Sequence, residues 1–120
     1  MHESILDSIK LALGIMVDYP YFDEQLITYT NAALAVLVQT GVGEPGFTIN
    51  GREALWEQFL GEKMAALEYS KAYVIMRVRL MFDPPQNSAA LQALKDMIAE
   101  YEWRGYVECD PIIEEENNRP

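Results

Sequence analysis

Apolar side chains follow a helical period along most of this chain, and residues 73–82 are apolar on nearly all sides. A helix at a protein surface needs only one apolar stripe. Residues 63–82 form two: Leu67, Ser70, Val74, Val78 and Met81 on one side, and Tyr69, Ala72, Tyr73, Met76 and Leu80 on the other. We expect the first stripe to pack in the core of the domain. The second stripe then needs another partner.

The sequence Asp83-Pro84-Pro85 marks the end of this helix, because proline lacks an N–H and moves the preceding residue out of the helical region. We predict that helix 63–82 is the longest in the chain and ends within about two residues of Asp83. Asn87 or Ser88 can accept a backbone N–H and begin the next helix. That last helix places four apolar residues on one side: Leu91, Leu94, Ile98 and Tyr101.

Shorter helical segments precede the long helix. Helix 4–13 begins with a capping box at Ser4 and ends before Gly14. A second helix begins with Asp23 as its cap and ends at Gly41. Residues 41–51 hold four glycines and a proline and form a loop, which a brief helix at 55–60 follows.

The sequence therefore predicts an all-α fold, a small bundle of three to four main helices with a long central helix and an acidic C-terminal tail. The predicted core residues share the apolar stripes of their helices: Ile9, Leu13, Leu26, Leu34, Leu37, Val74, Val78, Leu94 and Ile98.

The chain has 120 residues, which is the length of one domain, and a net charge of −10 from 9 bases and 19 acids. This acidity argues against a nucleic-acid surface, since Lys and Arg neutralise phosphates. It either keeps the protein soluble or fits a basic partner. We expect a helical domain at residues 1–106 and an acidic tail at 107–120 that is flexible until docked. Within the tail, Ile112-Ile113 is either incidental or a short docking element.

The residues required for catalysis or metal binding do not occur in a suitable pattern. His2 and Cys109 are the only histidine and cysteine, so neither a zinc site nor a nucleophile with its base can be assembled. The Gly41-Val42-Gly43 sequence lacks the third glycine and preceding strand of a phosphate-binding loop. We expect no catalytic, metal-binding or cofactor-binding residues, and hence a protein that binds rather than an enzyme. The sequence also predicts neither a signal peptide nor a membrane span, so we expect a protein that is made and used in a cytoplasm.

Three side chains allow two interpretations each. Trp103 lies off the apolar side of the last helix, so it either makes an interface contact or folds back on Tyr106 from a frayed helix end. Arg77 and Arg79 interrupt the long apolar helix. Their stems either follow the bundle surface with their charges in water, or one of them pairs with a carboxylate of a neighbouring subunit.

Three segments of the chain are residues 31–43, residues 73–88 and Glu100-Tyr101-Glu102-Trp103-Arg104. Together they resemble the small head–tail connector (adaptor) proteins of tailed bacteriophages, and the resemblance covers about residues 3–106. Its most specific part is Arg79-Leu80-Met81-Phe82-Asp83-Pro84-Pro85. The order of the helices, the Phe-Asp-Glu start of the second helix and the Trp-Glu-x-Phe-Leu-Gly segment at residues 56–61 also match.

The resemblance implies a structural virion protein, assembled in the bacterial host cytoplasm and located at the head–tail interface. Such adaptors are helical, are not enzymes, and form a ring, typically a dodecamer, under the portal protein. They extend the DNA channel toward the stopper or tail-completion protein, and DNA passes through without specific binding. An alternative from another class is a small helical regulatory protein that binds a host or phage protein as a dimer, which a mass measurement would distinguish from a ring.

The expected subunit and portal contacts follow from the second stripe of the long helix, from the position of Trp103 and from the apolar pair in the tail. The candidate interface residues are Tyr69, Tyr73, Met76, Leu80, Phe82, Trp103, Ile112 and Ile113.

Overall fold

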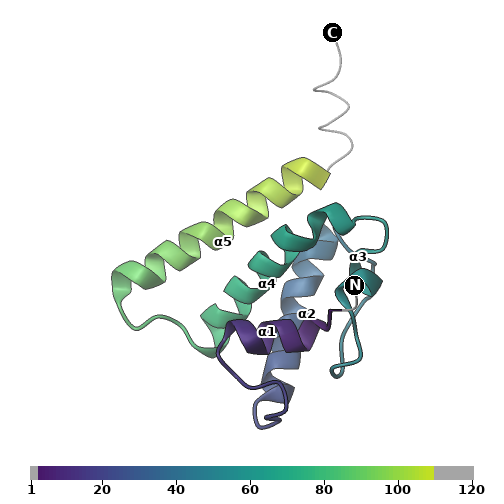
Figure 1. Ribbon diagram of the computed structural model, residues 1–120. Coiled ribbons are helices and arrows are strands. Elements are labelled where there is room, and N and C mark those ends of the chain that lie inside the picture. Colours follow the sequence, from purple (N-terminus) through teal and green to yellow (C-terminus); the bar gives the residue numbers. More distant parts are fainter. Residues whose placement is uncertain (1–2, 110–120) are drawn as a thin grey trace.

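A computed structural model describes residues 3–109, and its elements are helical (Figure 1). They are α1 (Ile5–Ala12), α2 (Asp23–Gln39), α3 (Trp56–Leu60), the 3₁₀ helix η1 (Met64–Ala66), α4 (Leu67–Phe82) and α5 (Ser88–Cys109). In this part of the chain, β-type pairing is limited to an isolated bridge between Ser4 and Leu55. The predicted all-α fold is confirmed.

The proline pair stops α4 at Phe82, as predicted, and Asn87 caps α5 by accepting from the N–H groups of Ala89 and Ala90. The expectation that α4 is the longest helix is wrong. It has 16 residues because residues 64–66 form a 3₁₀ turn, whereas α5 has 22. Helix α5 runs to Cys109, three residues beyond the expected domain boundary at 106.

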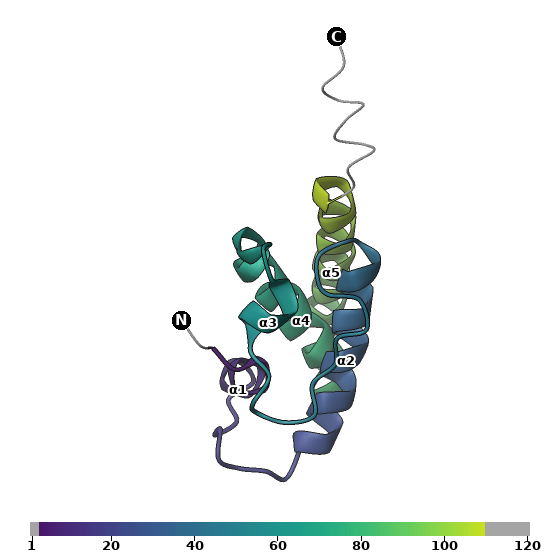
Figure 2. The same ribbon diagram turned by 90° about the vertical axis from the view of Figure 1, so that its right-hand side faces the viewer.

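Helix α4 lies at the centre of the molecule (Figure 1, Figure 2). It packs against α1 and α2 on one side and against α5 on the other. The second apolar stripe of α4 therefore has its partner within the same chain. The sequence pattern identifies a helix that needs two partners, but it does not say that α5 is the second one.

The core contains eight of the nine residues expected there, and Leu13 is only partly buried against it. The core also contains buried side chains beyond those nine, which come from α1, α3, α4 and the loop between α2 and α3. These are Ile5, Leu6, Val42, Ile49, Trp56, Phe59, Leu60 and Tyr73. The short helix α3 thus contributes more to the core than its five residues suggest.

The N-terminal segment is tied to the residues around α3 by hydrogen bonds across a long sequence separation. The Ile5 N–H donates to the Ala54 carbonyl at 3.0 Å, and the Trp56 N–H donates to the Glu3 carbonyl at 3.1 Å. The Trp56 indole N–H donates to the Ser8 hydroxyl at 2.8 Å. A buried Trp needs such a partner for its N–H. These bonds fix α1 against the second half of the fold.

Lys10 is a charged side chain that the structure buries completely. Its ammonium donates to the carbonyl oxygens of Val17 at 3.0 Å and Tyr19 at 2.6 Å, and it pairs with Asp23 at 2.7 Å. All three donors of the ammonium are therefore used, which is the condition for burying a lysine. Asp23 was expected to cap α2. The cap residue is instead Phe22, without a side-chain bond, and the Asp23 carboxylate pairs with Lys10.

Candidate assembly surfaces

Besides the apolar residues of the core, aromatic and polar side chains join α4 to α5. The rings of Tyr69 and Tyr101 stack at 5.4 Å, 6° from parallel, and the Tyr69 hydroxyl donates to the Tyr101 carbonyl. The Arg104 guanidinium lies over the Tyr101 ring, 5.9 Å from its centroid, and Arg104 Nη2 pairs with Glu100 at 2.5 Å. Tyr69 is thus half-buried by contacts with α5 of the same chain.

Tyr73 is fully buried, and its hydroxyl donates to Glu102 Oε2 at 2.6 Å. Burial, and then the hydrogen bond to Glu102, raise the pKa of Tyr73 well above its ordinary value. The same carboxylate lies 3.7 Å from the Arg77 Nη1 atom. Arg77 was expected either to reach water or to pair with another subunit, and the structure pairs it with α5 of its own chain. Its Nε is buried without a hydrogen-bond partner among the described residues.

The other interface candidates fall into three groups. Met76 and Leu80 are partly buried against the core, and Phe82 packs edge-on against Phe22 at 5.1 Å. Trp103 stands out from α5 with 66% of its surface exposed. Ile112 and Ile113 lie outside the described residues. Tyr69, Tyr73, Met76 and Leu80 therefore lie together on α4, but they contact other elements of the same chain.

A group of exposed apolar side chains occurs at the end of α1 and in the segment that the sequence predicted to be a loop. Leu11, Met16, Tyr19 and Tyr21 have 67%, 70%, 48% and 78% of their surfaces exposed, and we call these four residues the loop patch. They lie at the end of α1 and in the connection to α2. The density of aromatic residues in Tyr19-Pro20-Tyr21-Phe22 was the available signal, because polar residues normally fill such connections.

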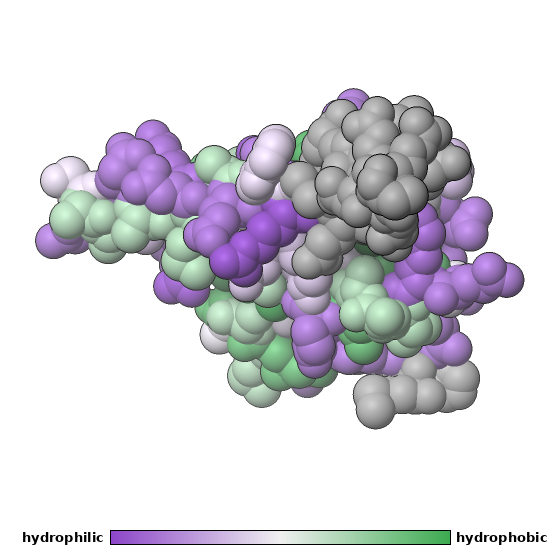
Figure 3. All heavy atoms as spheres, turned by 90° about the horizontal axis from the view of Figure 1, so that it is seen from above, coloured by the Kyte–Doolittle hydropathy of each residue, from purple (hydrophilic) through white to green (hydrophobic). Residues whose placement is uncertain are grey.

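The outward side of α5 combines charged residues with large apolar ones. Its exposed large apolar residues are Met97 and Trp103, at 48% and 66% exposure. The exposed charged residues Lys95, Asp96, Glu100 and Arg104 belong to the same part of the helix. We call these six residues the α5 outer face. In the view from above, hydrophobic and hydrophilic residues are mixed along the projecting edge that contains the start of α5 (Figure 3).

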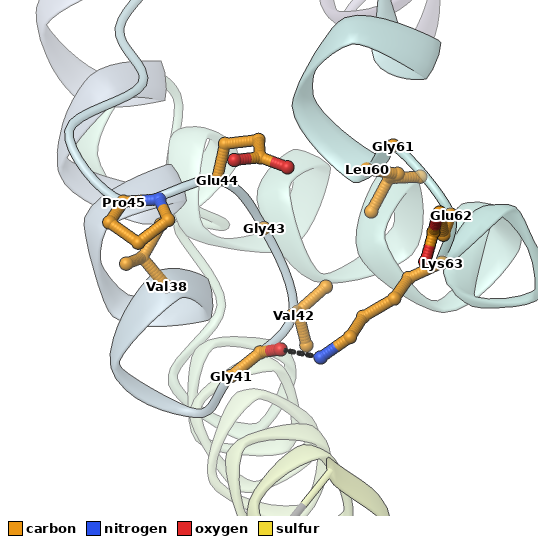
Figure 4. Close-up of a pocket in the computed structure, with 10 residues that line it drawn as sticks. All are labelled: Val38, Gly41, Val42, Gly43, Glu44, Pro45, Leu60, Gly61, Glu62 and Lys63. Carbon is orange, nitrogen blue, oxygen red and sulfur yellow. Dashed lines mark hydrogen bonds between the residues drawn. The ribbon is translucent and has the colours of Figure 1, made fainter.

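A hollow of about 560 Å³ separates the glycine-rich loop after α2 from the turn between α3 and η1 (Figure 4). Gly43 is required there, because a Cβ would come within 2.1 Å of the Phe59 ring. The Lys63 ammonium reaches across and donates to the Gly41 carbonyl. The carboxylates of Glu44 and Glu62 line the rim. These acids repel phosphate, so the loop is a packing element rather than a phosphate cradle.

Metal-binding clusters and membrane-spanning helices are both absent from residues 3–109. No group of three or more His, Cys, Asp or Glu side chains is placed to hold a metal ion. None of the helices in this range is long and apolar enough to cross a membrane.

The described structure defines a helical protein with two groups of exposed large apolar side chains, in the loop patch and on the α5 outer face. The comparison with protein families identifies the kind of helical protein. The model of the family described as phage connector protein matches residues 5–111. The chain belongs to this family and is a structural connector protein of a phage. The comparisons with curated proteins and with solved structures found no match.

Proposed function

We propose that the protein is a head–tail adaptor, which forms a ring under the portal protein and extends the DNA channel toward the stopper and tail. The observation that carries this proposal is the family match, which spans α1 to α5 without interruption. The exposed apolar residues supply surface for contacts with other virion proteins. A dodecamer is the expected size of the ring.

The charge of the chain supports passage of DNA without specific binding. The net charge is −10, and five of the bases are paired with acids of the same chain. Such a surface repels phosphates rather than neutralising them. A channel wall of this charge lets DNA move through without being held.

The proposed contacts with the portal and with neighbouring subunits differ in their accessibility. Trp103 is exposed on α5, and Phe82 is partly exposed. Tyr73 is buried under α5, so it could contact another protein only after α5 moved. For Ile112 and Ile113 we propose a docking role of the acidic tail, against the portal or an adjacent subunit.

The test is to mix the purified protein with phage heads that carry a portal, and to examine them by electron microscopy. We expect a ring of added density at the portal, and none on heads that lack a portal. A chain ending after Cys109 tests the tail, because it preserves α5. Failure of the full chain to bind portal-bearing heads would contradict the adaptor role. A stable dimer that ignores heads would support the regulatory alternative.

A further inference from the structure

Helix α5 is the main helix that is least embedded in the fold. It is the longest helix, and its principal contact is with α4. Of its residues 88–104, only Leu94 and Ile98 are buried, whereas α1 buries five of its eight residues. Segments with few buried apolar contacts open at the lowest cost in free energy. Helix α5 is therefore the main helix that separates most easily from the rest of the chain.

The connection at residues 83–87 has the properties of a hinge, and it joins α5 to α4 at one end (Figure 1). Asp83 has left the helical region, at φ −147° and ψ 68°, and Pro84-Pro85 keeps the chain extended after it. Within residues 3–109, residues 84–86 form no hydrogen bond or ion pair with another segment. Asn87 caps α5 from within its own segment, so α5 stays intact when the connection straightens.

The surface of α4 that α5 covers is specific for α5. The Tyr69 hydroxyl donates to the Tyr101 carbonyl, and Glu102 accepts from the Tyr73 hydroxyl and pairs with Arg77. Directed contacts of this kind exclude a helix with other residues at these positions, because the buried polar groups would lose their partners. A second copy carries an identical α5. It is therefore an occupant that matches this surface as well as the chain's own helix does.

We propose that neighbouring copies exchange α5, so that α5 of one copy lies on α4 of the next. Exchange of an identical element keeps the contacts of the closed chain and is a low-cost route to an oligomer. When each copy gives α5 to one neighbour and receives α5 from the other, the contact is head-to-tail, which is the kind that builds a ring. This inference rests on the proposed ring and names its subunit contact. The second stripe of α4 is then covered by α5 of the same chain in the free protein and by a neighbour's α5 in the ring.

The test reverses the charges of one ion pair in two separate chains, Arg77→Glu and Glu102→Arg. Each variant alone places like charges between α4 and α5, whether α5 comes from the same chain or from an identical copy. We therefore expect each variant alone to stay monomeric and to melt at least about 5 °C below the wild type. In an equimolar mixture, exchange places opposite charges at every contact between α4 and α5. After the two chains are warmed together, the mixture should regain most of the lost melting temperature, and native mass spectrometry should show complexes with equal numbers of both chains.

The matched control is a mixture of Arg79→Glu and Glu100→Arg. It makes the same charge changes at exposed positions of the same two helices, and these two residues do not pair with each other. We expect no mixed complexes from it. A test mixture that stays monomeric or melts like its separate components would overturn the inference, as would mixed complexes of the same kind in the control.

A cross-link provides a second measurement that does not depend on charge. Tyr69→Cys is introduced in one chain and Tyr101→Cys in another, both with Cys109→Ser, because the two rings stack at 5.4 Å. After the chains are warmed together, a short bifunctional thiol reagent should join one copy of each. Cross-linking no more frequent than for the pair Arg79→Cys and Tyr101→Cys would contradict exchange. Neither experiment contains phage heads, so the adaptor role can fail or hold independently.

Discussion

The two sides of α4 are held by different chemistry. Toward α1 and α2 the helix buries aliphatic side chains such as Val74 and Val78. Toward α5, which also buries apolar residues of its own, it adds Tyr69, Tyr73 and Arg77, whose partners are oxygen atoms and an aromatic ring. Apolar burial supplies most of the folding free energy but tolerates repacking. Directed polar contacts add less free energy and fix the position of α5 along α4.

The largest effect is expected from a cavity on the aliphatic side. Leu37 of α2 has 1% of its surface exposed, so Leu37→Ala should lower the free energy of unfolding by about 2–5 kcal/mol. Urea denaturation of the variant and the wild type measures the difference. A loss under about 1 kcal/mol would show that this side of α4 does not depend on tight packing.

Lys10 is a buried charge on α1, one of the two helices that pack on the aliphatic side of α4, and Lys10→Met tests its contribution. The Met side chain keeps the apolar stem but leaves two carbonyls and Asp23 without their donor. We expect a loss of about 2–3 kcal/mol, less than the cost of breaking a fully buried pair, because the partly exposed Asp23 can be rehydrated. Lys71→Met is the control, since its pair with Glu3, in which both side chains are partly exposed, should contribute under about 1 kcal/mol. Equal losses in the two variants would refute the special role of Lys10.

Tyr73→Phe tests the polar side of α4 by removing one hydroxyl. At neutral pH it should lower stability by about 1 kcal/mol, the usual net value of a hydrogen bond. The pKa of Tyr73 is raised in the fold, so the neutral phenol is the favoured form. Its contribution is fully present below the unfolded pKa of about 10 and is lost as pH rises further.

Unfolding experiments between neutral pH and pH 11 should therefore show a steeper alkaline loss in the wild type than in Tyr73→Phe. Tyr21→Phe serves as the control, because Tyr21 is exposed. Parallel pH profiles for the wild type and Tyr73→Phe would mean that the buried phenol does not contribute to the stability of the contact between α4 and α5.

The smallest expected effect is a gain in stability rather than a loss. The Thr30 hydroxyl of α2 is buried without a hydrogen-bond partner among the described residues, so Thr30→Val should leave stability unchanged or raise it by up to about 1 kcal/mol. Thr28→Val is the matched control, an exposed position whose hydroxyl donates to the Glu24 carbonyl. A clear loss of stability in Thr30→Val, but not in Thr28→Val, would show that the Thr30 hydroxyl makes a stabilising polar contact.

Much of the fold could be predicted from local signals. The proline pair ended α4, and Asn87 began α5, because each acts on the backbone of its own segment. The length of α5 could not be predicted in the same way, since its end has no comparable stop signal and Gly105 lies inside it. Local chemistry fixes where a helix breaks more reliably than how far it continues.

The candidate surfaces were predictable only in part. The helical angle of Trp103 correctly indicated exposure, because one turn of one helix decides it. The burial of Tyr73 was missed, since periodicity assigns a residue to a side of a helix without saying which element covers that side. The loop patch was missed because its shape depends on Lys10, a contact between segments that no local pattern encodes. The assembly role of these residues stays a prediction.

The hydrogen bonds between the N-terminal segment and α3 also bear on how the chain folds while it is synthesised. Trp56 and Ser8 are 48 residues apart, so α1 cannot make its native contacts until α3 has left the ribosome. The two helices α4 and α5 follow one another and can pair soon after synthesis, because local contacts form fast. The first helix made is therefore among those that must wait, and a chaperone that binds nascent chains would find Ile5, Leu6 and Ile9 uncovered during that interval.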